Sequence, residues 1–314
     1  MTDTVRVGTR RSTLATTQTG HVIARLAELL GRPVEPVYIR SDGDVLTGSL
    51  ASLGGAGVFV AALREAVLDG RCDLAVHSLK DLPAADVPGL TLFTPEREDP
   101  RDVLCAPPGA TWATLPQRAR VGTGSPRRAA QLLALRPDID VVDIRGNVDT
   151  RLARALGPDA DLDGVVLACA GLARLGREDA VTSAFDITVL TPAPGQGALA
   201  VEASDAALAD PSLAAALAAI DDEPTHLAVT AERALLERLG AGCAAPVGAL
   251  GTLDGATLSL RAVVVSLDGT RRLVRVGDAA LGDSDRHAAA RQLGIDLAET
   301  LLADGAADVA PLGA

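Results

Sequence analysis

The chain of 314 residues is longer than one hydrophobic core usually organises, and its 48% hydrophobic and 22% charged residues suit a soluble globular protein of two or three domains. The formal net charge of −12 argues against nucleic acid or an anionic membrane as the partner. The sequence contains no run of about 18 apolar residues, so it predicts no membrane span. The opening stretch MTDTVRVGTRRS lacks the apolar segment of a signal peptide, so we expect a cytoplasmic protein.

Strands and helices alternate in the first hundred residues. Short apolar strands are expected at VRVGT (5–9), VEPVYI (34–39) and DLAVHS (73–78), with helices over about 13–30 and 59–69. This order predicts an α/β sheet with crossover helices. The glycine-rich stretch 41–57 has no period and is long for a connection in a compact domain, so we interpret it as a mobile lid.

A second half begins near residue 100 and repeats the first. RVGT stands at 6–9 and again at 120–123, each time as a strand entering a turn with Ser or Thr ready to cap a helix. A strand is expected at 187–190, followed by a return crossing in TPAPGQGALAVE and a helix-rich stretch to residue 240. Strands at ATLSLRAVVVS and TRRLVRVGD and a helix over about 284–303 predict a third, smaller α/β domain.

The four cysteines lie far apart, and none forms a CxxC motif or pairs with a nearby histidine, so neither a zinc site nor a disulfide framework is predicted. Cys72 and Cys105 are interpreted as small core residues, and Cys169 in VVLACAG as a buried strand residue. Cys243 stands among glycines and alanines in GAGCAAPVG, on the loop that enters the third domain. A thiol with so few functional neighbours raises the question of what it does.

Arginines gather in three turns although the protein is acidic. VGTGSPRRAAQL places Ser125 at a helix N-cap and Arg127 and Arg128 in the first turn, where cations oppose the helix dipole by roughly 0.3 to 1 kcal/mol each. A bound anion would reverse that balance; the alternative is a solvated surface pair. VGTRRS contributes Arg10 and Ser12, and IRGNVDTR adds further arginines. Together they indicate a cleft for a substrate with several carboxylates or phosphates.

HSLKDLP follows a predicted buried strand and carries His77, Lys80 and Asp81. Lys80 is the only lysine in the chain, and the motif lies at the carboxyl end of a strand, where ligands bind in open α/β sheets. Asp81 is either a turn former or a carboxylate that stabilises a cationic intermediate and handles protons. His77 is interpreted as structural. No Gly-rich phosphate loop with lysine, HExxH or GxSxG motif occurs, so NTPase, zinc protease and hydrolase functions lack support.

The motifs VGTRRSTLA, GVFV, AVHSLKDLP, EREDPRDV, VGTGSPRR, IRGNVDTRL, LACAGLARLG, PGQGALAVE and TAERALLERLGAGCAAPVG occur in this order over essentially the whole chain, which resembles the porphobilinogen deaminase (hydroxymethylbilane synthase) family. The resemblance implies an α/β protein of three domains. The first two are like type II periplasmic binding proteins around a cleft, and the third is a small α/β domain carrying the cofactor cysteine. The domains would comprise residues 1–97 with 197–217, then 98–196, then 218–314.

The same resemblance implies a transferase of tetrapyrrole biosynthesis. Four porphobilinogen molecules would be joined head to tail onto a covalent dipyrromethane primer, held by a thioether to Cys243, and released as hydroxymethylbilane. Asp81 and Lys80 would be catalytic. No metal, nucleic acid or membrane is implied, and we expect a monomer. Contacts to cofactor and substrate carry over by motif to Arg10, Ser12, Thr123, Ser125, Arg127, Arg128, Arg145, Arg151, Arg174 and Gln196.

Two positions depart from the family pattern. Gly124 replaces a serine common in the turn GTSS, and Ala56 stands where many members have a lysine in the lid. One rival hypothesis is a non-catalytic anion-binding or sensor protein built on the same two-domain cleft. Another is a thiol redox protein, which would want a resolving cysteine near Cys243, and none is close in sequence.

Overall fold

The structure is a computed structural model that describes residues 4–39, 57–242, 244–282 and 284–312. The predicted lid, apart from Gly57, and Cys243 lie outside the described residues. Contacts between Cα atoms divide the chain into two compact units, Met1–Glu98 with Ala198–His226, and Asp99–Gly197 with Leu227–Ala314. Each unit is described by itself.

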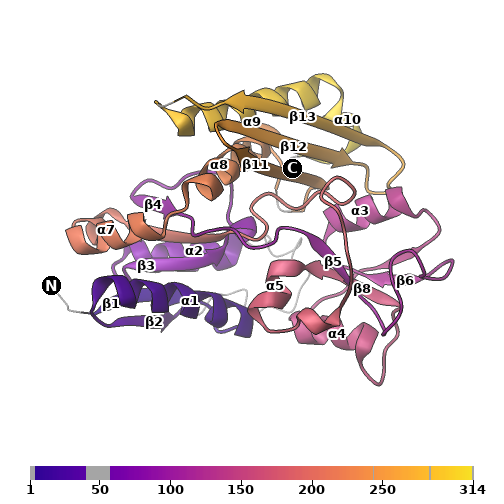
Figure 1. Cartoon of the computed structure of the whole chain (residues 1–314), viewed down its shortest axis with the longest axis horizontal. Helices are drawn as coiled ribbons and strands as arrows, with labels where there is room; N and C mark the ends of the chain where they lie inside the picture. The colour runs from indigo at the N-terminus through magenta and orange to yellow at the C-terminus, as the bar shows by residue number, and fades with distance from the viewer. Residues whose placement is uncertain (1–3, 40–56, 243, 283, 313–314) are drawn as a thin grey trace. The chain divides into compact units, whose positions relative to one another are not determined.

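The first unit is built on a five-stranded sheet in the order β2-β1-β3-β10-β4, of which Figure 1 labels β1 to β4. Its strands are β1 (Val5–Thr9), β2 (Val34–Tyr38), β3 (Leu74–Ser78), β4 (Leu90–Phe93) and β10 (Leu199–Ser204). β1 pairs in parallel with β2 and β3, whereas β10 runs antiparallel to β3 and β4. The predicted strands and the predicted α/β class of this half are confirmed.

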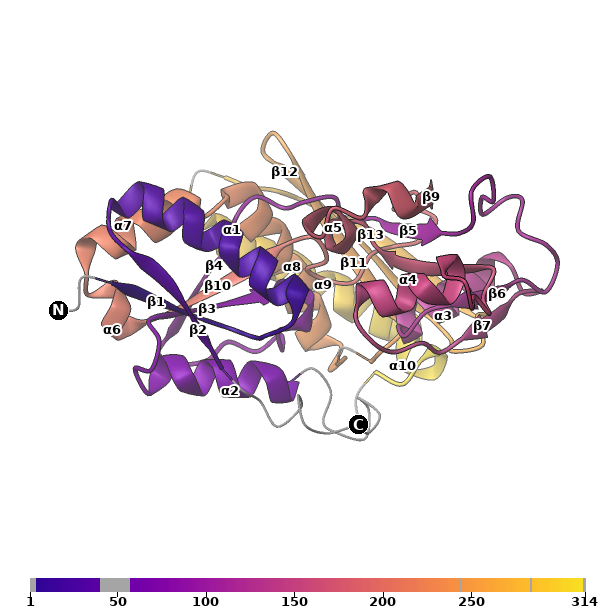
Figure 2. The same ribbon diagram turned by 90° about the horizontal axis from the view of Figure 1, so that it is seen from below.

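Helices cover both faces of this sheet, as Figure 2 shows. Side chains alternate along a strand, so Leu74 and Val76 of β3 join one core and Ala75 joins another. The first core packs α1 and α7 on the sheet, and the second packs α2. The helices of this unit are α1 (Thr13–Leu30), α2 (Gly57–Leu68), α6 (Asp205–Leu208) and α7 (Pro211–Ile220).

The second unit contains a five-stranded sheet in the order β7-β6-β8-β5-β9. Its strands are β5 (Asp102–Cys105), β6 (Arg120–Gly122), β7 (Asp140–Val142), β8 (Gly164–Ala168) and β9 (Val181–Ala184), with helices α3 (Pro126–Leu135), α4 (Val148–Leu156) and α5 (Cys169–Arg174). β6 pairs in parallel with β7 and β8, and β5 runs antiparallel to β8 and β9. Strand order and direction repeat those of the first sheet, with β6 in the place of β1. The predicted relation between the two halves is confirmed.

A third sheet completes the second unit. It is antiparallel, in the order β11-β12-β13, with strands β11 (Val247–Asp254), β12 (Thr257–Val265) and β13 (Arg272–Ala280). One face packs against α8 (Glu223–Arg238) and α9 (Arg286–Ala303), and α10 (Ala306–Val309) closes the same core. The chain is therefore an α/β protein with three sheets, two of one topology and a smaller third.

Two local predictions were wrong. The strand expected at 187–190 is a turn, because Asp186 Oδ1 accepts hydrogen bonds from the N–H and hydroxyl of Thr188 and bends the chain. The strand β9 lies just before it. Cys169 is not a buried strand residue: β8 ends at Ala168, and the partly exposed Cys169 begins α5. Cys72 and Cys105 are buried, as predicted. No helix in the described ranges is long and apolar enough to cross a bilayer.

Candidate cofactor-binding and catalytic residues

Strand β3 delivers Lys80 and Asp81 to a turn at the surface of the first unit. β3 is buried over four of its five residues, and a single turn of 3-10 helix, η2 (Leu79–Asp81), follows directly. Leu79 and Leu82 are buried on either side of the two polar residues. These leucines anchor the turn, so that Asp81 is exposed and Lys80 is half-buried. The carboxylate is thus presented to solvent from a fixed backbone.

The end of β3 is braced by a buried ionic cluster. His77 Nε2 lies 3.2 Å from Glu202 Oε2, and Arg64 donates to the same carboxylate from Nε at 3.0 Å and from Nη2 at 2.8 Å. Burial raises the pKa of Glu202, but the hydrogen bonds and charges of His77 and Arg64 outweigh it and hold that pKa at about 2. His77 is therefore a core residue, in agreement with its interpretation as structural.

The turn after β1 carries Arg10 and Ser12 in the same unit. Ser12 is the N-cap of α1, and its Oγ accepts from the Ala15 N–H at 3.3 Å. Arg10 is half-buried at the start of the turn. Next to it, the Arg11 guanidinium lies 5.6 Å from the centre of the Tyr38 ring. The turn is held by a cap and a cation–π contact, which leaves Ser12 at the surface.

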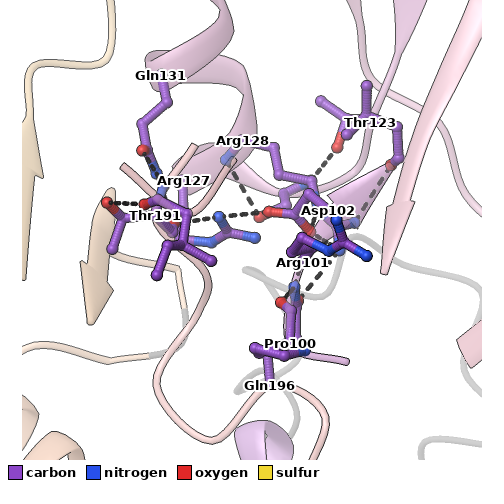
Figure 3. Close-up of polar contacts among 12 residues, drawn as sticks. Pro100, Arg101, Asp102, Thr123, Arg127, Arg128, Gln131, Thr191 and Gln196 are labelled. Carbon is purple, nitrogen blue, oxygen red and sulfur yellow. Dashed lines mark hydrogen bonds and ion pairs between the residues drawn. The ribbon is translucent and has the colours of Figure 1, made fainter. Parts of the chain in front are cut away.

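Arg127 and Arg128 lie in the corresponding turn of the second unit, at the start of α3. Ser125 is the N-cap, with Oγ accepting from the Arg128 N–H at 3.4 Å, and Pro126 follows it. Both arginines are buried, with 3% and 5% of their surface exposed, so the alternative of a solvated surface pair is wrong. Figure 3 shows both guanidiniums directed at Asp102, the first residue of β5.

Asp102 pairs with both arginines at once. Its Oδ2 lies 2.8 Å from Arg127 Nη1, and its Oδ1 lies 2.8 Å from Arg128 Nε and Nη2. Burial raises the pKa of Asp102, but the two positive charges outweigh it and bring that pKa to about 2. Burial also lowers the pKa of Arg127, against the opposing charge of Asp102. One carboxylate thus balances two buried cations, and one positive charge is left over.

The return crossing closes this cluster from below. Gln196 Oε1 accepts from Arg128 Nη2 at 3.2 Å, while its Nε2 donates to Asp102 Oδ1 at 2.8 Å and to Pro100 O at 2.7 Å (Figure 3). Arg174, the last residue of α5, donates from Nη2 to Gly197 O at 2.8 Å. Both side chains are buried. They fix the PGQG turn against the arginine cluster.

Arg145 and Arg151 flank the start of α4. Asn147, the only asparagine in the chain, caps this helix by accepting from the Thr150 N–H at 2.8 Å. Arg151 donates from Nε to Gly146 O at 2.8 Å, and exposed Arg145 lies 3.3 Å from Asp143. This third arginine turn is more open than the pair on α3.

The turn between β6 and α3 comes close to the Arg145 loop. Buried Thr123 accepts from the Ser125 N–H through Oγ1 at 3.3 Å. A Cβ added at Gly124 would lie 2.5 Å from Ile144 O, closer than real Cβ atoms approach. Glycine at position 124, where the family commonly has serine, therefore leaves room for the Arg145 turn to lie close to the turn that begins α3.

Sequence reasoning missed the residue at the centre of the cluster. Asp102 stood in the quoted motif EREDPRDV, but its partners Arg128 and Gln196 are 26 and 94 residues away in the chain. A signal was present, because an aspartate opens the run DVLC, which is buried throughout. A charged group at such a position needs a buried partner of opposite sign.

The predicted site residues divide between the two units. The first unit holds Arg10, Ser12, Lys80 and Asp81. The second brings together Thr123, Ser125, Arg127, Arg128, Arg174 and Gln196, with Arg145 and Arg151 on the next turn. Cys243 falls in the second unit by sequence but outside the described residues.

The arginine cluster suits an anionic ligand. It has one positive charge in excess, and Arg127 Nε is a buried donor without an acceptor among the residues that the structure describes. A buried donor that lacks a partner costs free energy, which a ligand carboxylate would offset. Within the described ranges, no group of three or more His, Cys, Asp or Glu residues could hold a metal ion.

Comparison with known proteins agrees with these features. The family model of the porphobilinogen deaminase dipyromethane cofactor binding domain matches residues 5–209, and that of the porphobilinogen deaminase C-terminal domain matches residues 226–303. A porphobilinogen deaminase of Micrococcus luteus is 52% identical over 96% of this chain and 93% of its own. One of Cutibacterium acnes is 52% identical over 99% and 98%.

A solved ABC-transporter periplasmic substrate-binding protein of Coxiella burnetii is 15% identical, with a TM-score of 0.44 over 70% of this chain and 93% of its own. The family models describe an enzyme and its dipyrromethane-binding domain, so a non-catalytic anion-binding or sensor protein is not favoured. The chain belongs to the porphobilinogen deaminase family.

Proposed function

We propose that this protein is a transferase that joins four porphobilinogen molecules head to tail and releases the linear tetrapyrrole hydroxymethylbilane. We further propose that it acts as a cytoplasmic monomer, without metal, nucleic acid or membrane partners. The observation that carries the proposal is the presentation of Asp81 at an exposed turn by a buried strand, in a chain that matches the family over both of its domain models.

Asp81 is the group that acts on the reacting carbon. The aminomethyl group leaves as ammonia from its protonated, ammonium form. The electron pair of the C–N bond goes with the nitrogen, and the substrate carbon becomes cationic until the free α-carbon of the terminal pyrrole forms the new C–C bond and loses its proton. A carboxylate beside that carbon stabilises the positive charge that develops there, and this stabilisation is greater in the transition state than in the ground state, in which the charge lies on the nitrogen. Lys80, the only lysine in the chain, directly precedes Asp81 and supplies a positive charge that can bind a substrate carboxylate.

The arginines bind the carboxylates of cofactor and substrate. Each pyrrole carries an acetate and a propionate, so a chain of several rings brings many negative charges. Arg127 and Arg128 would hold the dipyrromethane, because their buried pair has excess positive charge and an unused donor. Arg10, Ser12, Arg145 and Arg151 lie nearer the surface, which suits groups that receive each incoming ring.

The remaining contacts orient this grip. Thr123 and Ser125 hold the turn that begins α3, and Arg174 and Gln196 hold the PGQG turn against Arg128. When bound, the dipyrromethane supplies the pyrrole position to which the first substrate ring is joined. Cys243 would attach it by a thioether, since a covalent primer must survive every round of elongation and release.

Turnover of porphobilinogen by Asp81→Asn tests the proposal. The amide keeps the size of the side chain and removes its charge, so we expect turnover to fall by about 10² to 10³ while the thermal unfolding midpoint stays at the wild-type value. Asp69→Asn is the matched control, because Asp69 is also exposed in the first unit and should tolerate the change. Turnover of Asp81→Asn at the wild-type rate would mean that Asp81 is only a turn residue.

A further inference from the structure

Helix α3, which carries Arg127 and Arg128, packs on the face of the third sheet opposite α8 and α9. On β12, Leu260 and Ala262 point toward α8 and α9, whereas Val263 and Val265 pack against Ala130 of α3. The helix that carries Arg127 and Arg128 therefore lies directly on the sheet whose first strand follows the loop of Cys243 in sequence.

Gln131 of α3 holds the segment Thr191 and Pro192, which lies between α3 and the third sheet. Its Nε2 donates to Thr191 O at 3.0 Å, and its Oε1 accepts from the Thr191 N–H at 2.8 Å. Gln131 is 1% exposed and Thr191 is fully buried, so neither contact is shared with solvent. Arg127 Nη1 donates to the same Thr191 O at 2.6 Å (Figure 3). The backbone of Thr191 is thus held by an amide that pairs with it as a neighbouring strand would.

The third sheet grips the same segment from the opposite side. The Ala249 N–H of β11 donates to Pro192 O at 2.9 Å, and Arg261 Nε of β12 donates to Thr191 Oγ1 at 3.3 Å. A Cβ at Gly248 would lie 2.6 Å from Thr191 O and 3.0 Å from Pro192 O. Only glycine lets β11 approach this closely, so Thr191 and Pro192 set the position of β11 against α3.

We propose that Gln131 is a positioning residue of the reaction. By holding Thr191, it determines where β11 begins relative to Arg127 and Arg128. β11 starts at Val247, four residues after Cys243, and four residues span at most about 14 Å. A displaced β11 therefore moves the chain that follows the attachment cysteine in sequence, relative to Arg127 and Arg128. The inference rests on the proposed function, in which Cys243 holds the primer and the arginines bind its carboxylates.

The rate at which the protein acquires its primer distinguishes a positioning role of Gln131 from a role in stability alone. The full chain would be produced in cells starved of porphobilinogen, then given porphobilinogen and followed by intact mass well below its unfolding midpoint. Gln131→Met keeps the length of the side chain but removes both hydrogen bonds to Thr191. Gly248→Ala perturbs the same segment from the other side. We expect both variants to gain the primer mass about 10- to 100-fold more slowly than wild type, as for a misplaced reacting group.

Two control variants match these changes. Leu297→Ala weakens the opposite face of the third sheet, and Gly171→Ala adds a methyl group where no atom lies within 4 Å. Both should gain the mass at nearly the wild-type rate, even though Leu297→Ala lowers the unfolding midpoint.

The outcomes separate the inference from the proposed function. If the wild type gains the primer mass and the Gln131→Met and Gly248→Ala variants gain it equally fast, only the inference is contradicted. So does Leu297→Ala if it is slowed as much as they are, because stability alone would then explain the effect. A wild type that never gains mass contradicts the proposed function, and the inference falls with it. Should Gln131→Met fail to fold, Gly248→Ala decides alone.

Discussion

Replacing Arg128 by lysine should prevent stable loading of the primer, although the charge is kept. Arg128 donates to Asp102 Oδ1 at 2.8 Å, to Val166 O at 3.3 Å and to Gln196 Oε1 at 3.2 Å. A lysine is a point donor on a flexible stem and cannot reach three divergent acceptors together. If it keeps Asp102, two buried acceptors lose a donor, at roughly 1 to 3 kcal/mol each, or about 2 to 6 kcal/mol together.

Two readings on the same sample measure this effect. Thermal unfolding should show a lower midpoint, and intact mass after purification should show that most molecules lack the primer. Arg154→Lys is the control, because Arg154 makes a two-pronged pair with Asp161 that is open to solvent, and the midpoint and the primed fraction should hardly change. An Arg128→Lys protein that is fully primed and unfolds like wild type would refute the carboxylate grip assigned to Arg128.

Further predictions concern the open arginines and the buried carboxylate. Arg10→Lys should keep the primer and stall elongation, so intact mass after incubation with porphobilinogen should show a primed protein with few added rings; normal elongation would exclude Arg10 from substrate binding. Because the pKa of Asp102 is held at about 2, below the ordinary 3.8, its charge stabilises the fold above the ordinary value, and this contribution of about 2 kcal/mol is lost as pH falls from about 4 toward 2. Urea unfolding across that range should show a smaller loss for Asp102→Asn than for wild type, and parallel losses would contradict the assigned pairing.

Local sequence signals predicted the helix starts and the repeat of topology. Ser12 and Ser125 cap α1 and α3 three residues before the N–H groups that they accept from, as the spacing indicated. RVGT marked β1 and β6, which hold the same place in two sheets of one strand order. Such features depend on neighbours within a few residues, so a single sequence carries them.

Features that depend on distant partners could not be predicted in this way. The burial of Arg127 and Arg128 follows from Asp102 on another strand, and the glycine at 248 follows from the carbonyl of Thr191. Glycines in β11 also weakened its strand pattern, and that strand was not predicted. The sequence therefore showed that arginines gather in turns, but it did not show Asp102, the counter-ion that pairs with Arg127 and Arg128.

The chemical role of Cys243 depended on family resemblance rather than on its local pattern. A thiol among small residues gives no periodicity, no ligand spacing and no partner cysteine from which to argue. The family models then supplied the cofactor class, while the attachment point remains this chain's own prediction.

Intact mass of the purified wild type and of Cys243→Ala tests the covalent primer most directly. Cys72, Cys105 and Cys169 remain in the variant, so any modification of another thiol would persist there. We predict that the wild type is heavier than its sequence by one dipyrromethane unit and that Cys243→Ala has the mass of its sequence alone. An unmodified wild type that stays unmodified after incubation with porphobilinogen, or an added mass that survives in Cys243→Ala, would contradict the assignment.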